Sequence, residues 1–183
     1  AVVSKRASNP SIGYQLDTTV DTGPRTIGFK LTNSSGTLMV RYGSTALQIN
    51  QWYHIAGVYD AASQTLNVYL NGQLDNGSLV GTVTSSQQNS SVAVNIGNRP
   101  GATGSYNFAG KIDDIRIYNR ALSQAEIQNN MNTAVGTATN TAPTISAIAV
   151  QATNEDTPTS AIAFTVGDAE TAVGLSETDV IEE

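Results

Sequence analysis

Gly110-Lys-Ile-Asp-Asp-Ile-Arg-Ile-Tyr-Asn-Arg-Ala-Leu-Ser-Gln-Ala-Glu126 is the most informative stretch of the chain, because an alternating pattern runs into a helix start. Ile115 and Ile117 fall on one face of an extended strand, with polar side chains between them. Strand parity places Asp113 on the same face. A carboxylate on an apolar face is costly unless hydrogen bonds or a cation satisfy it. The stretch therefore predicts a strand over 111–118 in which Asp113 needs a partner.

The end of the same stretch predicts a short helix. Ser123 and Glu126 have capping-box spacing, in which the hydroxyl accepts from a backbone N–H and the carboxylate reaches back to the cap. We expect a helix from Ser123 to about Met131, too short to be more than an accessory to a β structure.

Short strand patterns separated by turn residues fill the first 120 residues. Asn71-Gly72 is the dipeptide best suited to a tight hairpin turn. Many short strands at this spacing indicate an all-β sandwich or barrel. The expected strands are 12–16, 25–31, 38–42, 52–59, 65–70, 91–96 and 111–118.

The composition excludes several classes of site. The 183 residues include no cysteine, so disulfides and thiolate metal sites are absent. Residues 1–120 carry nine Lys and Arg against six Asp and Glu, whereas residues 121–183 carry nine acidic residues and no basic one. The sequence has no basic patch with interleaved aromatic residues of the kind that would indicate nucleic-acid binding. It also has no apolar run long enough for a membrane span. The acidic end leaves room for calcium.

The change in charge accompanies a change in organisation. Residues 1–132 read as one β domain, and the small polar residues of 133–142 as a linker. Residues 143–183 resume a β pattern but are few for an independent fold, so we expect the start of a second, truncated domain. The chain begins without Met or a signal peptide, which is expected of an excerpt from a longer protein.

Four motifs in order resemble a known family. The match runs over about residues 1–131 and resembles the laminin-G-like branch of the concanavalin A-like lectin/glucanase superfamily. The resemblance implies an antiparallel two-sheet jelly-roll sandwich that lacks its N-terminal strands. It also implies an adhesion or glycan-binding module of secreted or surface proteins, often bacterial. The motifs are Trp52-Tyr-His-Ile-Ala-Gly-Val-Tyr-Asp60, Leu66-Asn-Val-Tyr-Leu-Asn-Gly72, Ile96-Gly-Asn98 and the 110–123 segment.

A second, shorter resemblance concerns the end of the chain. Ala142-Pro-Thr-Ile-Ser146, Asn154-Glu-Asp-Thr-Pro158 and Phe164-Thr-Val-Gly-Asp-Ala-Glu170 resemble the opening of an immunoglobulin-like or cadherin-like repeat of bacterial surface proteins. Their acidic residues suit either calcium between repeats or an ordinary solvated surface.

The residues argue against an enzyme. Glycosidases need two carboxylates that face each other across the sugar. Glu126 is the only glutamate in residues 1–150, and its capping role already explains it. His54, the only histidine, shares strand parity with Trp52, so we expect both side chains in the core, although a histidine can also bind a ligand and a tryptophan can also stack on a sugar.

The loop over 97–110 is the best candidate for a binding site. Tyr106 could stack on a sugar, with Arg99, Asn98 and Asn107 as hydrogen-bond donors; the alternative is that Tyr106 closes the end of the sandwich. The family resemblance carries a structural calcium to Asp113. The alternative is that this carboxylate accepts backbone N–H groups.

We therefore expect a non-catalytic recognition or adhesion module that binds a glycan or an extracellular protein through loops at the end of the sandwich. The alternatives are a structural spacer without a ligand and an accessory domain of a distant catalytic module. Fold alone does not identify a ligand.

Overall fold

The computed structural model describes residues 1–7, 10–99, 106–135, 144–148, 155–156 and 161–167. The chain divides into two compact units, Ala1–Val135 and Gly136–Glu183, and each is described by itself. In the described residues of the second unit, β10 (Thr144–Ile145) pairs antiparallel with β11 (Val166–Gly167). Both strands lie within the β pattern expected there.

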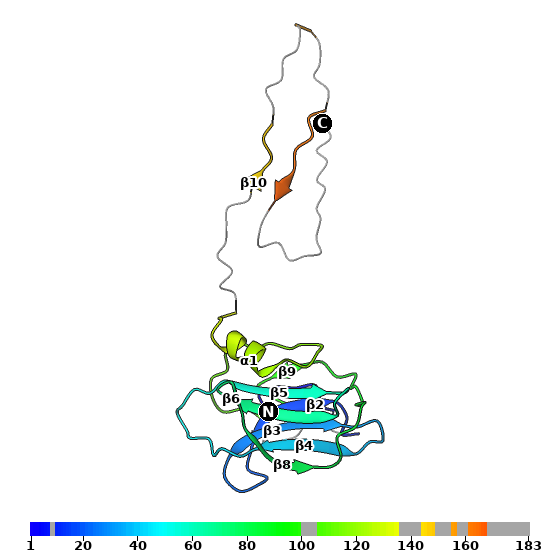
Figure 1. Cartoon of the computed structure of the whole chain (residues 1–183), viewed down its shortest axis with the longest axis vertical. Helices are drawn as coiled ribbons and strands as arrows, with labels where there is room; N and C mark the ends of the chain where they lie inside the picture. Colours follow the sequence, from blue (N-terminus) through cyan, green and yellow to red (C-terminus); the bar gives the residue numbers. More distant parts are fainter. Residues whose placement is uncertain (8–9, 100–105, 136–143, 149–154, 157–160, 168–183) are drawn as a thin grey trace. The chain divides into compact units, whose positions relative to one another are not determined.

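The first unit is an antiparallel two-sheet sandwich, as predicted (Figure 1). Six strands form the larger sheet in the order β8-β4-β3-β2-β1-β9, and three form the smaller sheet in the order β5-β6-β7. The larger sheet consists of β1 (Val3–Ser4), β2 (Tyr14–Thr19), β3 (Thr26–Thr32), β4 (Leu38–Gly43), β8 (Asn76–Val80) and β9 (Asn95–Ile96). The smaller sheet consists of β5 (Ile55–Asp60), β6 (Thr65–Leu70) and β7 (Gln73–Leu74).

Strand alternation explains the core. In β3, Ile27, Phe29 and Leu31 point toward the smaller sheet and are 0%, 9% and 3% exposed. They pack with Met39 of β4 and with Leu66 and Val68 of β6. Burying such a side chain contributes about 2 kcal/mol, so this cluster is the main apolar support of the sandwich.

The smaller sheet packs closely on that core at Gly57 of β5. A Cβ atom on Gly57 would lie 2.4 Å from Cγ of Phe29 and 2.7 Å from two further ring carbons. No real side chain tolerates such a contact, so the glycine allows the strand to approach the ring. The hairpin that follows turns at Asn71 and Gly72, whose φ angles are 49° and 74°, as the dipeptide predicts.

The predicted helix is confirmed as α1 (Gln124–Met131), and so is its capping box. The backbone N–H of Ser123 donates to Oε2 of Glu126 at 2.8 Å, and the N–H of Glu126 donates to Oγ of Ser123 at 3.3 Å. A hydrogen bond from Arg120 and the bonds from Ser123 lower the pKa of Glu126 to about 2. The cap carboxylate is therefore ionised above that pH.

The predicted strand over 111–118 is wrong: these described residues form no strand. The physical reason is Asp114, whose φ of 48° turns the backbone out of the extended region and breaks the alternation. Ile117 is consequently 55% exposed rather than buried beside Ile115. Arg116 instead fastens the segment to α1, donating to the carbonyls of Asn130, at 2.6 Å, and Thr133.

Other strand boundaries differ from the prediction at their ends. The run over 91–96 shortens to β9, whereas β1, β7 and β8 are strands that the pattern did not indicate. β5 begins at Ile55 rather than at Trp52, so parity does not govern Trp52. The expectation that Trp52 lies in the core is wrong, since its side chain is 63% exposed.

Candidate functional site

The structure brings together the four residues expected to bind a ligand. The N–H of Phe108 donates to the carbonyl of Gly97 at 2.8 Å, which joins the two ends of the loop beside β9. Asn98 and Asn107 are exposed, and Tyr106 is 44% exposed. An aromatic ring and two amide side chains therefore lie on one accessible part of the surface.

Arg99 has a different role from the one expected. It is 9% exposed, and its guanidinium lies 5.1 Å from the centroid of the Tyr106 ring. The Nη2 atom donates to the carbonyl of Ala7 at 3.3 Å and to Oγ of Ser11 at 3.5 Å. A cation over an aromatic face is attracted by the ring, so Arg99 holds Tyr106 in place from below.

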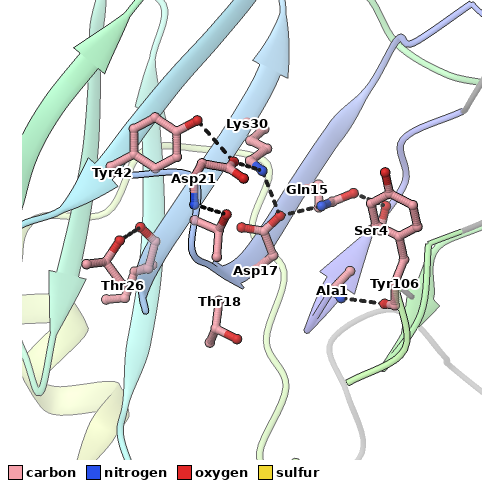
Figure 2. A network of polar contacts seen from close by, with 12 residues as sticks. Ala1, Ser4, Gln15, Asp17, Thr18, Asp21, Thr26, Lys30, Tyr42 and Tyr106 are labelled. Atoms are coloured by element: carbon pink, nitrogen blue, oxygen red, sulfur yellow. Dashed lines mark hydrogen bonds and ion pairs between the residues drawn. The ribbon is translucent and has the colours of Figure 1, made fainter. Parts of the chain in front are cut away.

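The loop lies next to a polar layer on the outer face of the larger sheet, the face away from the apolar core. Figure 2 shows a chain of contacts that runs across β4, β3, β2 and β1. Lys30 is its centre, with Nζ 2.9 Å from Oδ2 of Asp21 and 3.2 Å from Oδ2 of Asp17. The Tyr42 hydroxyl donates to Asp21 at 3.1 Å.

The same layer continues from Asp17 toward the loop. Gln15 donates to Oδ2 of Asp17, and the Ser4 hydroxyl donates to Oε1 of Gln15 at 3.4 Å. The N–H of Arg6 then donates to the Ser4 hydroxyl at 3.2 Å. We call the polar layer the set of Ser4, Arg6, Gln15, Asp17, Asp21, Lys30 and Tyr42.

Within the polar layer, the ammonium group of Lys30 and the neighbouring carboxylate of Asp21 stabilise one another's charged forms. Burial acts to lower the pKa of Lys30, but Asp17 and Asp21 outweigh it and raise that pKa. The hydrogen bond from Lys30 lowers the pKa of Asp21. The two carboxylates are therefore partners of one ammonium group.

The sequence prediction missed the polar layer. Gln15, Asp17 and Thr19 alternate along β2, and each is at most 7% exposed. Polar alternation is normally read as a solvated strand face, so the pattern alone gave no reason to expect burial. One signal in the sequence could have indicated the layer. The neighbouring strand β3 also has polar side chains on this face, Thr26 and Lys30, and they pair with Thr19 and Gln15 of β2.

A second feature is a cavity of about 1070 Å³ on the core side of the larger sheet. It lies between β5 and the 111–122 segment. Core residues such as Phe29 and Leu31 form part of its wall, together with Trp52 and His54. Its lining is mainly apolar, and among the strands that the structure describes β5 pairs with β6 alone.

His54 was expected to be a hydrogen-bonded core residue, and the structure contradicts this. Its side chain is partly buried and its Nδ1 is buried without a hydrogen-bond partner. Burial and the nearby charge of Arg116 lower its pKa. The imidazole is therefore neutral at pH 7.

Asp113, the expected calcium ligand, is exposed. Its Oδ1 accepts the N–H of Asp114 at 3.0 Å, which matches the alternative of a carboxylate that caps backbone groups. Among the residues that the structure describes, no three His, Cys, Asp or Glu side chains are grouped as a metal site. Calcium at Asp113 stays a prediction.

The fold and the site together define a lectin-like β-sandwich domain with an accessible loop site. A laminin G family model, described as the concanavalin A-like lectin/glucanases superfamily, matches residues 1–128. The chain belongs to this superfamily, in which binding modules are common. Neither the curated proteins nor the solved structures gave a match. Within the described part of the chain, no helix is long and apolar enough to cross a membrane.

Proposed function

We propose that the first unit is a non-catalytic recognition module that binds carbohydrate through Asn98, Tyr106 and Asn107, with Arg99 beneath the ring. The observation that carries this proposal is the half-exposed Tyr106 held by the buried Arg99 at 5.1 Å. An aromatic face accepts the apolar face of a sugar ring, and adjacent amides offer both donors and acceptors to its hydroxyl groups.

The polar layer supports a binding role over catalysis. Retaining and inverting glycosidases need one carboxyl group that donates a proton and a second that acts as nucleophile or base. Asp17 and Asp21 both have a carboxylate oxygen within 3.2 Å of Nζ of Lys30, so one ammonium group engages both. The hydrogen bond from Lys30 lowers the pKa of Asp21, which makes Asp21 a poor proton donor at neutral pH.

Replacing Tyr106 with alanine tests the site. We expect Tyr106→Ala to weaken glycan binding by roughly tenfold or more, because an anchoring aromatic side chain is worth more than 1.4 kcal/mol. The measurement is a glycan array to find a ligand, followed by calorimetric titration. Tyr118→Ala is the matched control, since Tyr118 is 43% exposed and lies outside the loop.

The result is interpretable only if the variants fold, so thermal unfolding is recorded for both. Equal loss of affinity in the two tyrosine variants would remove the loop site. Failure of every glycan to bind would favour the alternatives of a protein partner or a structural spacer.

Calcium is proposed as a structural ion at Asp113, supported by the family and by the exposed carboxylate. Titrating calcium should raise the melting temperature of the chain, and Asp113→Ala should abolish that rise. A rise that persists in the variant would take Asp113 out of the site. The Asp60→Ala variant is the control, because Asp60 is also an accessible carboxylate that accepts backbone N–H groups, here in a turn.

The wider setting is part of the same proposal. We infer a secreted or cell-surface protein in which the second unit begins an immunoglobulin-like or cadherin-like repeat. The pairing of β10 with β11 supports a β structure there. Glu155 and Asp156 are exposed, whereas Asp168 and Glu170 lie outside the described residues.

A further inference from the structure

Three buried polar atoms without a hydrogen-bond partner gather beside the loop site. They are Oδ1 of Asp17, Nε of Arg6 and Nε of Arg99, and these side chains belong to residues that are 5%, 8% and 9% exposed. In the described part of the chain only one further side-chain atom, Nδ1 of His54, is in this state. Buried polar groups are ordinarily paired, so three together indicate a missing partner.

The three atoms are not equivalent. Oδ1 of Asp17 points at Gly28, where a Cβ atom would lie 2.5 Å away, so the strand itself closes off this oxygen. The other oxygen of Asp17 is already engaged by Lys30 and Gln15. Asp17 is therefore engaged by Lys30 and Gln15, and it forms no ion pair with either arginine.

Neither arginine has a carboxylate within ion-pair distance among the described residues, where the ion pairs are those of Lys30 and Arg120. Burial and the repulsion from Arg99 both lower the pKa of Arg6. The carboxylate of Asp17 acts in the opposite direction but does not outweigh them. Two guanidinium groups in mutual repulsion, one of them under the exposed ring, favour the approach of an anion.

Burial limits what that anion can be. Less than a tenth of either arginine is exposed, which leaves an edge for a single substituent and not for a whole sugar ring. Tyr106 is half-exposed beside them and can carry the ring. The site thus has two distinct positions: Tyr106, on which a sugar ring can stack, and the edge of Arg6 and Arg99, which can bind a charged substituent.

We infer that the loop site selects an acidic glycan, with its ring on Tyr106 and its carboxylate or sulfate group at Arg6 and Arg99. This inference rests on the proposed carbohydrate binding and adds the charge of the ligand to it. Guanidinium groups bind both anions through charge-assisted hydrogen bonds.

The test compares ligands that differ only in charge. An oligogalacturonate is titrated beside its methyl-esterified form, which keeps the sugar and removes the charge, and a heparin-derived oligosaccharide represents sulfate. We expect an acidic ligand to bind roughly tenfold or more tightly than the ester, since a hydrogen bond to a charged group contributes about 1.5–3 kcal/mol.

Arg6→Gln should remove that preference, so that the variant binds the acid no more tightly than the ester. Arg25→Gln is the matched control, because Arg25 is exposed and belongs to the same sheet region, and its loss lowers the net charge equally. If Arg6→Gln fails to fold, a competition experiment on the unaltered protein tests the inference instead. Inorganic sulfate should displace the acidic ligand and leave the ester bound.

The outcomes separate the two proposals. Equal affinity for acid and ester, or binding of neutral glycans alone, overturns the charge selection and leaves carbohydrate binding intact, as expected if ordered water satisfies the arginines. Absence of binding to every glycan overturns both. Preference for the acid that Arg6→Gln and Arg25→Gln reduce equally also overturns the inference, because it would reflect net charge only.

Discussion

Gly57→Ala should lower the stability of the first unit by about 3 kcal/mol, at the upper end of the usual cost of overpacking a core. The added methyl would lie 2.4 Å from Cγ of Phe29, a ring that is 9% exposed and packed against both sheets. Either β5 or the ring must move. Urea unfolding followed by circular dichroism measures the change, and a loss of this size lowers the melting temperature by about 10 °C.

A double variant identifies the clash. Phe29→Ala removes Cγ and both Cδ atoms at the contact, so Gly57→Ala should cost less in the Phe29→Ala background than in the unaltered chain. If the two losses simply add, the ring is not what the methyl meets, and the packing argument for Gly57 fails.

Asp75→Ala is expected to destabilise the same unit by roughly 2–4 kcal/mol, because a buried carboxylate that accepts several hydrogen bonds from the 44–45 turn would be lost. Asp75 is 6% exposed, and its Oδ1 accepts the hydroxyl of Ser44 at 2.7 Å and that of Thr45 at 2.6 Å. The N–H of Thr45 donates to the same oxygen at 3.1 Å. Denaturant unfolding gives the loss in free energy.

Asp60→Ala is the control for burial. Asp60 also accepts from donors in a turn, Ala62 and Ser63, but its own carboxylate is accessible whereas that of Asp75 is buried, so water can replace it. Its loss should cost much less than the loss of Asp75, as is usual at surfaces. Equal losses at the two aspartates would show that burial does not determine the contribution of Asp75.

The sequence predicted those parts of the fold in which local chemistry and tertiary packing agree. Alternation along β3 and β6, the turn at Asn71-Gly72 and the cap of Ser123 on α1 are of this kind. Each depends on neighbours within a few residues, which a pattern can show.

The predictions were wrong where a contact with residues remote in sequence, or a single backbone angle, determines the local structure. The segment over 111–118 reads as a strand, but the φ of Asp114 and the bonds from Arg116 to the end of α1 give it another path. The same limit applies to the site. The loop residues were predicted, yet the burial of Arg99 beneath Tyr106 depends on Ala7 and Ser11, which are remote in sequence.

The position of β1 has a consequence for the order of assembly. Val3 pairs with Leu16 on one side and with Ile96 on the other, so the two-residue strand β1 joins an early strand of the domain to a late one. During synthesis β2, β3 and β4 can form their consecutive hairpins early, whereas β1 keeps one edge open until β9 has emerged. Closing such a long loop carries an entropic cost before any contact compensates it, which is characteristic of slowly folding β proteins. The loop that carries Tyr106 follows β9 directly, so the candidate binding surface is completed only after the sheet beneath it has closed.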